Sequence, residues 1–249
     1  MNKKLNTALV IGGNGGIGIA TVSRLLDDGF FVVATYNNNK EKLETLAQNH
    51  KSSKNLKYIK LNTTSLDDVQ LQLKKVINSN DKIDVIVLSI SGAYKNIRIF
   101  DLKWIEIANF FENQVQSLYN IHFALKEQIK EKVRTKYIVL LSDVCFGSPP
   151  KGFAHYVSAK YALFGFAKSL SLELSTYGST LNMISPGMVE TEMLVNMPRK
   201  LLEINASQNP LERNGLPEDV SSVISFLASD KSDYLNGINV PVNGGSKLL

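Results

Sequence analysis

Residues 7–34 read TALVIGGNGGIGIATVSRLLDDGFFVVA, and the expected fold class follows from this stretch. The apolar run Thr7–Ile11 predicts a short buried strand, which leads into a glycine-rich turn and then a helix over 19–28. Gly29 ends that helix, and 30–34 predicts a second strand. In such a unit the glycines let backbone N–H groups approach a pyrophosphate, and the helix N-terminus adds positive potential. The pattern favours a dinucleotide site, with a plain tight turn as the alternative.

A second stretch, residues 136–171, carries the candidate catalytic pair. It combines a predicted strand over 137–141, a Gly/Ser/Pro loop and a helix in which Tyr156 and Lys160 are four residues apart. That spacing places both side chains on one helix face. A neighbouring ammonium lowers the pKa of a tyrosine from about 10, because the positive charge favours the phenolate, so the phenol becomes a proton donor or acceptor near neutral pH. Without further context, two ordinary surface residues would be the simpler interpretation.

Three more landmarks follow in order along the chain. They are NMISPGMVETEM at 182–193, PLERNGLPEDV at 210–220, and an ending that contains VNGG at 242–245. With the glycine turn and the Tyr/Lys pair, they resemble the short-chain dehydrogenase/reductase family over nearly all 249 residues, and within it the 3-oxoacyl-[acyl-carrier-protein] reductase-like branch. The resemblance implies an α/β fold over 1–249: one Rossmann-type doubly wound parallel sheet of about seven strands, with helices on both faces.

Composition agrees with one domain of this kind. The chain has a mass of 27.6 kDa, with 44% hydrophobic and 20% charged residues. A single cysteine, Cys145, excludes an internal disulfide and suits a reducing cytoplasm. No apolar run approaches the roughly 18 residues of a membrane span, and residues 1–13 lack a cleavable secretory pattern. We therefore expect a cytoplasmic protein that begins near Met1, with no membrane partner.

Charge and histidine content argue against two further classes of site. The net charge of +5 comes from scattered basic residues without interleaved aromatic residues, so no nucleic-acid partner is expected. His50, His122 and His155 are too dispersed to suggest a metal site, and His155 is given no role.

Three basic side chains are predicted to form a stripe on one helix. Lys126, Lys130 and Arg134 recur every four residues in the helix expected over 115–133, so they would line one face, where an acidic carrier protein could dock. A solvated surface, interleaved with acidic residues, is the alternative.

The end of the second predicted strand bears on the choice of cofactor. The resemblance implies that NAD-using relatives carry a carboxylate there, which bonds the ribose hydroxyls and repels a 2′-phosphate. This chain has Tyr36, followed by Asn37, Asn38, Asn39 and Lys40. Because no carboxylate excludes the phosphate and amides plus an ammonium can bind it, NADP(H) is favoured over NAD(H). A polar turn without such a role is the alternative.

The resemblance implies further cofactor contacts along one edge of the sheet: an amide beside the adenine, a glycine near the ribose, and a Pro-Gly turn facing the nicotinamide. The complete expected set is Gly12, Asn14, Gly15, Gly16, Ile17, Gly18, Tyr36, Asn37, Asn38, Asn62, Thr63, Ser91, Gly92, Tyr156, Lys160, Pro186, Gly187, Val189 and Thr191.

The catalytic positions depart from the family pattern. The family's catalytic serine lies thirteen residues before the tyrosine, a position that is Asp143 here. Ser142 is adjacent but would point to the opposite strand face. An ionised Asp143 would repel the oxyanion that develops during hydride attack, whereas a protonated Asp143 would donate to it. Contact with a cationic or hydroxylated substrate group is another possibility. Gln114 stands where an Asn usually holds a proton-relay water.

The expected function is therefore NADPH-dependent carbonyl reduction, with a 3-oxoacyl thioester on an acyl carrier protein as one substrate class, as in fatty-acid or polyketide biosynthesis. Tyr156 would protonate the oxygen and Lys160 would hold the ribose, with Asp143 and Gln114 in modified supporting roles. Residues 188–213 resemble a mobile substrate lid. The alternative is a cofactor-binding subunit with weak or no activity that supports an active reductase. The resemblance implies a homotetramer or homodimer, or a hetero-oligomer with another member of the family.

Overall fold

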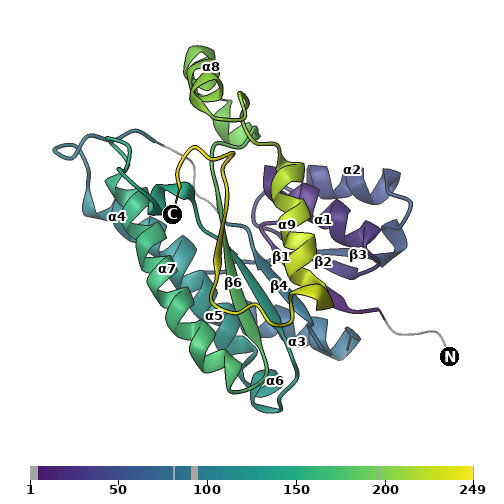
Figure 1. The fold of residues 1–249 in the computed structure, drawn as a ribbon. Helices are drawn as coiled ribbons and strands as arrows, with labels where there is room; N and C mark the ends of the chain where they lie inside the picture. The colour runs from purple at the N-terminus through teal and green to yellow at the C-terminus, as the bar shows by residue number, and fades with distance from the viewer. Residues whose placement is uncertain (1–4, 81, 91–94, 196, 249) are drawn as a thin grey trace.

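The computed structural model describes residues 5–80, 82–90, 95–195 and 197–248. These residues form a seven-stranded parallel sheet with the order β3-β2-β1-β4-β5-β6-β7 (Figure 1). The strands are β1 Thr7–Ile11, β2 Phe31–Tyr36, β3 Leu56–Lys60, β4 Val85–Leu88, β5 Lys136–Leu140, β6 Thr180–Pro186 and β7 Asn239–Val242. The doubly wound α/β fold expected from the sequence is confirmed.

The helices alternate with the strands along the chain. They are α1 Gly16–Asp27, α2 Glu41–Asn49, α3 Leu66–Asn80, α4 Trp104–Phe111, α5 Ser117–Ala124, α6 Lys126–Lys130, α7 Ala154–Ser175, α8 Arg199–Gln208 and α9 Pro217–Ala228. A π-helical turn, Glu112–Gln116, joins α4 to α5, and short 3-10 turns cover Ser53–Asn55, Asp143–Cys145, Glu192–Leu194 and Asp230–Ser232. In the described part of the chain, none of the helices is long and apolar enough to cross a lipid bilayer.

The sheet is buried on both faces. Along β1, Leu9 and Ile11 point into one apolar cluster, whereas Ala8 and Val10 point into the other, because successive strand side chains alternate. Helices α3, α5 and α7 cover the first face, and α1 and α9 cover the second (Figure 1). Double coverage explains why Thr7–Ile11 reads as an unbroken apolar run rather than an alternating one.

The strand order reverses beside β1, and this places the site. β1 pairs in parallel with β2 on one side, Leu9 opposite Val33, and with β4 on the other, Leu9 opposite Ile86. In open parallel sheets, ligands bind in the crevice at the carboxyl ends of the strands where the order reverses. The glycine turn follows β1 at that edge, so the topology places it at the expected crevice.

The segment 115–133 differs from the single helix expected there. The chain leaves α5 at Leu125, and α6 ends at Lys130. Lys132 then adopts a left-handed backbone conformation with φ of 56°, which turns the chain away from the helix axis. Arg134 consequently lies off the helix, and its guanidinium donates to Asp233 at 2.8 Å. The prediction of one continuous three-residue basic stripe is therefore wrong.

Candidate active site

The glycine turn after β1 is held so tightly that a Cβ at Gly12, Gly13, Gly16 or Gly18 would come closer than 3.0 Å to another atom. A Cβ at Gly12, whose φ is +77°, would lie 2.5 Å from the carbonyl oxygen of Ser89. A Cβ at Gly16 would lie 2.5 Å from the Thr191 side chain. Asn14, Gly15, Ile17 and Gly18, predicted as cofactor contacts, lie in or directly after the same turn.

The first turn of α1 provides the anion-binding feature that the sequence suggested. Gly15 is the N-cap residue, and among the described residues no side chain caps the backbone N–H groups there. Uncapped N–H groups at a helix N-terminus, with the positive end of the helix dipole, suit a phosphate. The turn therefore suits a dinucleotide in its backbone donors, which the closely packed glycines hold in place.

The end of β2 presents two aromatic rings and a row of amides. The Tyr36 ring packs against Tyr58, with centroids 6.4 Å apart, and Asn37 and Asn38 are exposed beyond it. Lys40 forms an ion pair with Glu44 at 2.7 Å, and this hydrogen-bonded contact raises the pKa of Lys40. The structure thus places Tyr36 and the amides of Asn37 and Asn38 side by side, with no carboxylate at position 36. The Lys40 ammonium is already paired with Glu44.

The two residues predicted to lie beside the adenine follow β3. The Asn62 side chain is exposed, and its oxygen accepts from the Thr64 hydroxyl at 2.8 Å. Thr63 is tied to α5, because the Ser117 hydroxyl donates to its side-chain oxygen at 2.7 Å. Both lie at the carboxyl edge of the sheet with the glycine turn. The other two predicted contacts of this region, Ser91 and Gly92, lie outside the described residues.

Tyr156 and Lys160 share one face of α7, as their spacing predicts. The Lys160 ammonium lies 5.8 Å from the centroid of the Tyr156 ring and donates to the Leu140 carbonyl oxygen at 2.9 Å. Lys160 is 1% exposed, and this burial lowers its pKa to about 7, with a smaller opposing effect from Cys145. The Tyr156 ring packs edge-on against Phe110 and is also buried. This pair is the best candidate for proton transfer in the molecule.

Asp143 lies three residues after the end of β5, at the position where the family pattern has a serine. It opens the 3-10 turn Asp143–Cys145, and the Ser142 hydroxyl caps this turn by accepting the Val144 N–H at 3.3 Å. This bond uses an acceptor site of the Ser142 oxygen, and whether Ser142 replaces the missing hydroxyl stays a prediction. The Asp143 carboxylate lies 3.6 Å from where a Cβ on Gly187 would be. Burial raises the pKa of Asp143.

Gln114 sits in the π-helical turn between α4 and α5. Such turns often mark functional sites in helices. The side chain is buried, and neither its amide nitrogen nor its oxygen has a hydrogen-bond partner among the described residues. A buried amide without partners is rare and indicates a place for a water molecule or a polar ligand group. The relay role expected from the sequence remains a prediction.

The turn after β6 carries the remaining predicted contacts. Pro186 ends β6, and the Gly187 N–H donates to the Val242 carbonyl at 3.0 Å, which holds the turn against β7. Val189 is buried, and Thr191 lies over Gly16. The structure therefore brings this turn to the glycine turn, across the crevice edge.

The segment beyond that turn makes several polar contacts. Glu192 forms an ion pair with Lys42 of α2 at 2.7 Å. Helix α8 buries none of its residues. The Asn209 amide donates to the Asn243 carbonyl at 2.9 Å, and the Asn205 amide donates to the Asn214 side chain at 2.8 Å.

Three residues near the candidate site were not found by reasoning from the sequence. The Lys247 ammonium donates to the Asp143 carbonyl oxygen at 3.1 Å, and the Ser246 hydroxyl donates to its carboxylate at 3.5 Å. Both come from the end of the chain, where no local pattern indicates a contact 100 residues away. His155 is buried, and its ring packs edge-on against Phe110 with centroids 4.9 Å apart. Its position beside Tyr156 was the only available signal.

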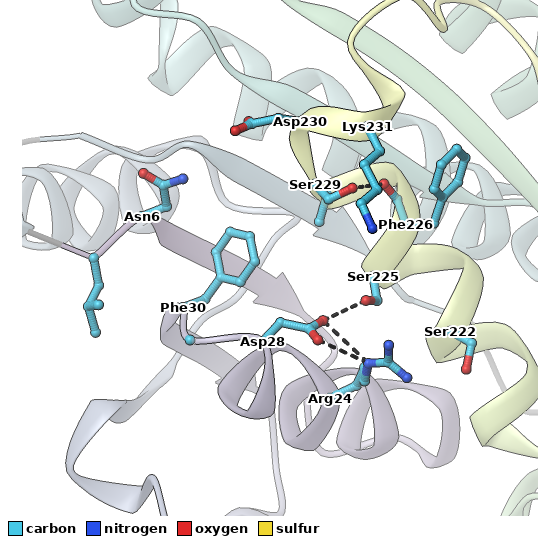
Figure 2. A pocket seen from close by; sticks show the side chains of 13 residues that line it. Asn6, Arg24, Asp28, Phe30, Ser222, Ser225, Phe226, Ser229, Asp230 and Lys231 are labelled. Atoms are coloured by element: carbon cyan, nitrogen blue, oxygen red, sulfur yellow. Dashed lines mark hydrogen bonds and ion pairs between the residues drawn. The ribbon is translucent and has the colours of Figure 1, made fainter.

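A further hollow lies at the other end of the sheet. This cavity of about 580 Å³ is bordered by α1, α9 and the residues that precede β1 and β2 (Figure 2). Asp28 accepts a hydrogen bond from Ser225 at 2.5 Å and forms an ion pair with Arg24 at 3.2 Å. Because it opens at the amino ends of the strands, it is remote from the Tyr156 side of the sheet.

Comparison with known proteins agrees with this geometry. The sequence model of a family described as "Enoyl-(Acyl carrier protein) reductase" matches residues 12–247. The chain is 30% identical to a 3-oxoacyl-[acyl-carrier-protein] reductase of Staphylococcus aureus, over 98% of both chains. It is 31% identical to the enzyme of the same name from Rickettsia conorii, over 98% of this chain and 97% of that one.

Two solved structures share the fold. Acetoin dehydrogenase YohF from Salmonella typhimurium superposes with a TM-score of 0.83 at 23% identity, covering 97% of each chain. ElxO with NADP bound superposes with a TM-score of 0.88 at 21% identity, covering 97% of this chain and 98% of that one. The glycine turn, the Tyr156/Lys160 pair and the full-length match to these relatives agree: the chain belongs to the short-chain dehydrogenase/reductase family.

Proposed function

We propose that this chain is an NADPH-dependent reductase of carbonyl groups, with a 3-oxoacyl thioester carried by an acyl carrier protein as its substrate class. The observation that carries the proposal is the Tyr156/Lys160 pair, buried on one face of α7 beside the crevice. The names of the curated relatives support the choice of substrate class. Catalytic reduction is favoured because two buried polar side chains in this arrangement have little structural reason to be present together.

The side chains divide the reaction between them. The cofactor, when bound, supplies a hydride to the carbonyl carbon of the substrate. Tyr156 gives its phenolic proton to the carbonyl oxygen as negative charge develops there. Lys160 bonds the ribose hydroxyls and, when protonated, favours the tyrosinate and so eases proton transfer. Because burial holds the Lys160 pKa at about 7, cofactor hydroxyls that replace lost solvation would favour its charged form.

The preference for NADP(H) over NAD(H) rests on the end of β2. Tyr36 replaces the carboxylate that would repel a 2′-phosphate, and the Asn37 and Asn38 amides provide donors for it. The ElxO structure binds NADP on a similar fold. In this proposal residues 188–213 form the substrate lid, which is hinged at the turn after β6 and closes over the bound cofactor.

A second candidate function follows from Asp143. A carboxylate at the serine position opposes the oxyanion, so the chain would bind cofactor but turn over weakly and serve as the structural partner of an active reductase. In the first candidate, Asp143 and Gln114 instead support the reaction in altered form. The two differ in assembly as well: the enzyme would form a homo-oligomer, and the structural subunit would co-purify with a second reductase.

The test measures NADPH and NADH oxidation with a panel of 3-oxoacyl thioesters, simple ketones and an enoyl thioester. The enoyl substrate is included because of the description of the matching family. The proteins are wild type, Tyr156→Phe, Asp143→Ser and Tyr161→Phe, the last being a matched control because Tyr161 is exposed on the same helix. Cofactor binding is titrated in parallel.

Turnover of the 3-oxoacyl thioester by the wild type and by Tyr161→Phe, with at least about a hundredfold loss in Tyr156→Phe, would support the reductase. A wild type that binds NADPH but is inert on every substrate, together with an active Asp143→Ser, would refute it and support the structural subunit. Reduction of the enoyl thioester alone would refute the proposed substrate class.

A further inference from the structure

The chain ends in a compact loop that returns to the candidate active site. After β7, Gly244 and Gly245 adopt left-handed φ values of +63° and +82°, which side chains at these positions would strain. The Gly245 N–H donates to the Asn243 side-chain oxygen at 3.0 Å, and the Asn243 amide donates to the Lys247 carbonyl at 2.9 Å. The loop is therefore closed on itself, and the yellow end of the chain lies beside the upper end of α7 (Figure 1).

This loop, residues 243–247, places two polar side chains on Asp143. The Lys247 ammonium donates to the Asp143 backbone oxygen at 3.1 Å and lies 3.9 Å from a carboxylate oxygen. The Ser246 hydroxyl donates to the other carboxylate oxygen at 3.5 Å. The side chains of Asp143 and Lys247 are only 17% and 27% exposed, so water screens their attraction less than on an open surface.

We propose that Lys247 is a positioning residue of the active site, whose ammonium balances the Asp143 carboxylate and so removes its opposition to the substrate oxyanion. The inference rests on the proposed reductase function. Asp143 stands where a hydroxyl would donate to the developing negative charge, and alone it would repel that charge. The Lys247 ammonium is held beside Asp143 by the closed loop. The net charge of the Asp143–Lys247 pair is then close to zero, so the pair repels the oxyanion little. The carboxylate and the chain terminus thus form one functional unit.

The surroundings of Asp143 leave Lys247 as its main electrostatic partner. The other titratable group on the same turn is the Cys145 thiol, which is neutral because burial raises its pKa to about 11. Tyr156 and Lys160 lie on α7, which packs against that turn, and the Lys160 ammonium is directed to the Leu140 carbonyl. Burial raises the pKa of Asp143, and Lys247 and Ser246 act against this rise.

An ion-paired Asp143 and a protonated Asp143 predict opposite changes in activity when the Lys247 charge is removed. Removing the Lys247 charge raises the Asp143 pKa further, so more of the carboxyl is protonated at neutral pH. If a protonated Asp143 were the working form, activity would rise. If the ion pair is the working form, activity falls.

The experiment compares Lys247→Gln, which keeps a donor for the Asp143 carbonyl but has no charge, with Lys247→Arg, which keeps the charge. We expect kcat to fall about tenfold or more in Lys247→Gln at unchanged NADPH affinity, and to stay within about threefold of wild type in Lys247→Arg. In the Asp143→Ser background, Lys247→Gln should change kcat less than about twofold, because there is no carboxylate to balance. Lys231→Gln, an exposed lysine at the far end of the sheet, is the matched control.

Unchanged or faster turnover in Lys247→Gln, or an equal loss in both backgrounds, would overturn the proposal. If wild type and all variants are inert, the proposed reductase function fails, and the pair is judged separately by NMR titration of the 13C-labelled Asp143 carboxyl. A higher Asp143 pKa in Lys247→Gln than in wild type then supports the ion pair, and the same pKa in both overturns it.

Discussion

Replacing Lys160 by methionine should change how the stability of the protein depends on pH. The ammonium is fully buried, and its pKa falls from the ordinary 10.5 to about 7. At about 1.4 kcal/mol per pKa unit, a protonated Lys160 therefore destabilises the folded state by roughly 5 kcal/mol. Methionine has a similar length and carries no charge, so Lys160→Met removes this destabilisation.

The sign follows from proton binding. Between pH 7 and 10.5 the unfolded chain binds more protons at Lys160 than the folded chain, so wild-type stability rises with pH in this window. The cost is fully present below pH 7 and disappears as the pH approaches 10.5. From pH 7 to pH 9 the destabilisation caused by protonated Lys160 should fall from about 4 to about 2 kcal/mol. Lys160→Met has no titrating group at this position, so this contribution is absent.

The assay is urea unfolding at fixed protein concentration, at pH 7, 8 and 9, for wild type and Lys160→Met. The difference in unfolding free energy between them should shrink by about 2 kcal/mol over this range. Loss of the hydrogen bond to the Leu140 carbonyl shifts the whole curve by about 1–3 kcal/mol but does not depend on pH, so the slope is the informative quantity. Lys168→Met, at an exposed position on the same helix, should give a curve parallel to wild type. If the Lys160→Met curve is also parallel to wild type, the buried Lys160 ammonium does not destabilise the folded state.

Three further changes test other parts of the structure. Ser142→Ala should lower the unfolding free energy by about 1 kcal/mol in urea denaturation while turnover persists, because the hydroxyl caps a backbone turn. A complete loss of activity would contradict this. Gly12→Ala should cost more than about 2 kcal/mol and abolish NADPH binding by fluorescence titration, since its Cβ would meet the Ser89 carbonyl at 2.5 Å in a left-handed conformation; normal binding would contradict the tight turn. Glu192→Gln breaks the partly exposed ion pair with Lys42 and should change the substrate KM less than about fivefold. At 1 M salt the variant and wild type should have the same KM, because salt screens the pair. A larger change in KM that does not depend on salt would show a different role for this contact.

Much of the fold could be predicted because its signals are local. The glycine turn and the continuous apolar strands each depend on residues within a few positions of one another. The prediction of a single helix over 115–133 was wrong because the helical pattern of apolar residues continues up to Lys132, where the backbone already turns.

The candidate site was predictable only in part, for a related reason. Tyr156, Lys160 and Asp143 could be found by counting along one segment. The contact between Lys247 and Asp143 spans 104 residues, and only the three-dimensional path of the chain after β7 creates it. No composition or spacing rule contains that information, because Ser246 and Lys247 lie beyond the VNGG landmark and carry no pattern of their own.

The asparagine contacts around α8 make this segment sensitive to chemical change during storage or heating. Asparagine is among the heat-labile residues, and its loss converts an amide, which donates hydrogen bonds, into a carboxylate, which at neutral pH only accepts them. At Asn214, which precedes Gly215, that conversion would set a carboxylate against the Leu202 carbonyl to which the amide now donates at 3.3 Å. Because α8 has no buried residues to hold it in place, heating should loosen this segment irreversibly while the sheet beneath it stays folded. The useful life of a stored sample would then be set by slow covalent change in a few amides rather than by unfolding.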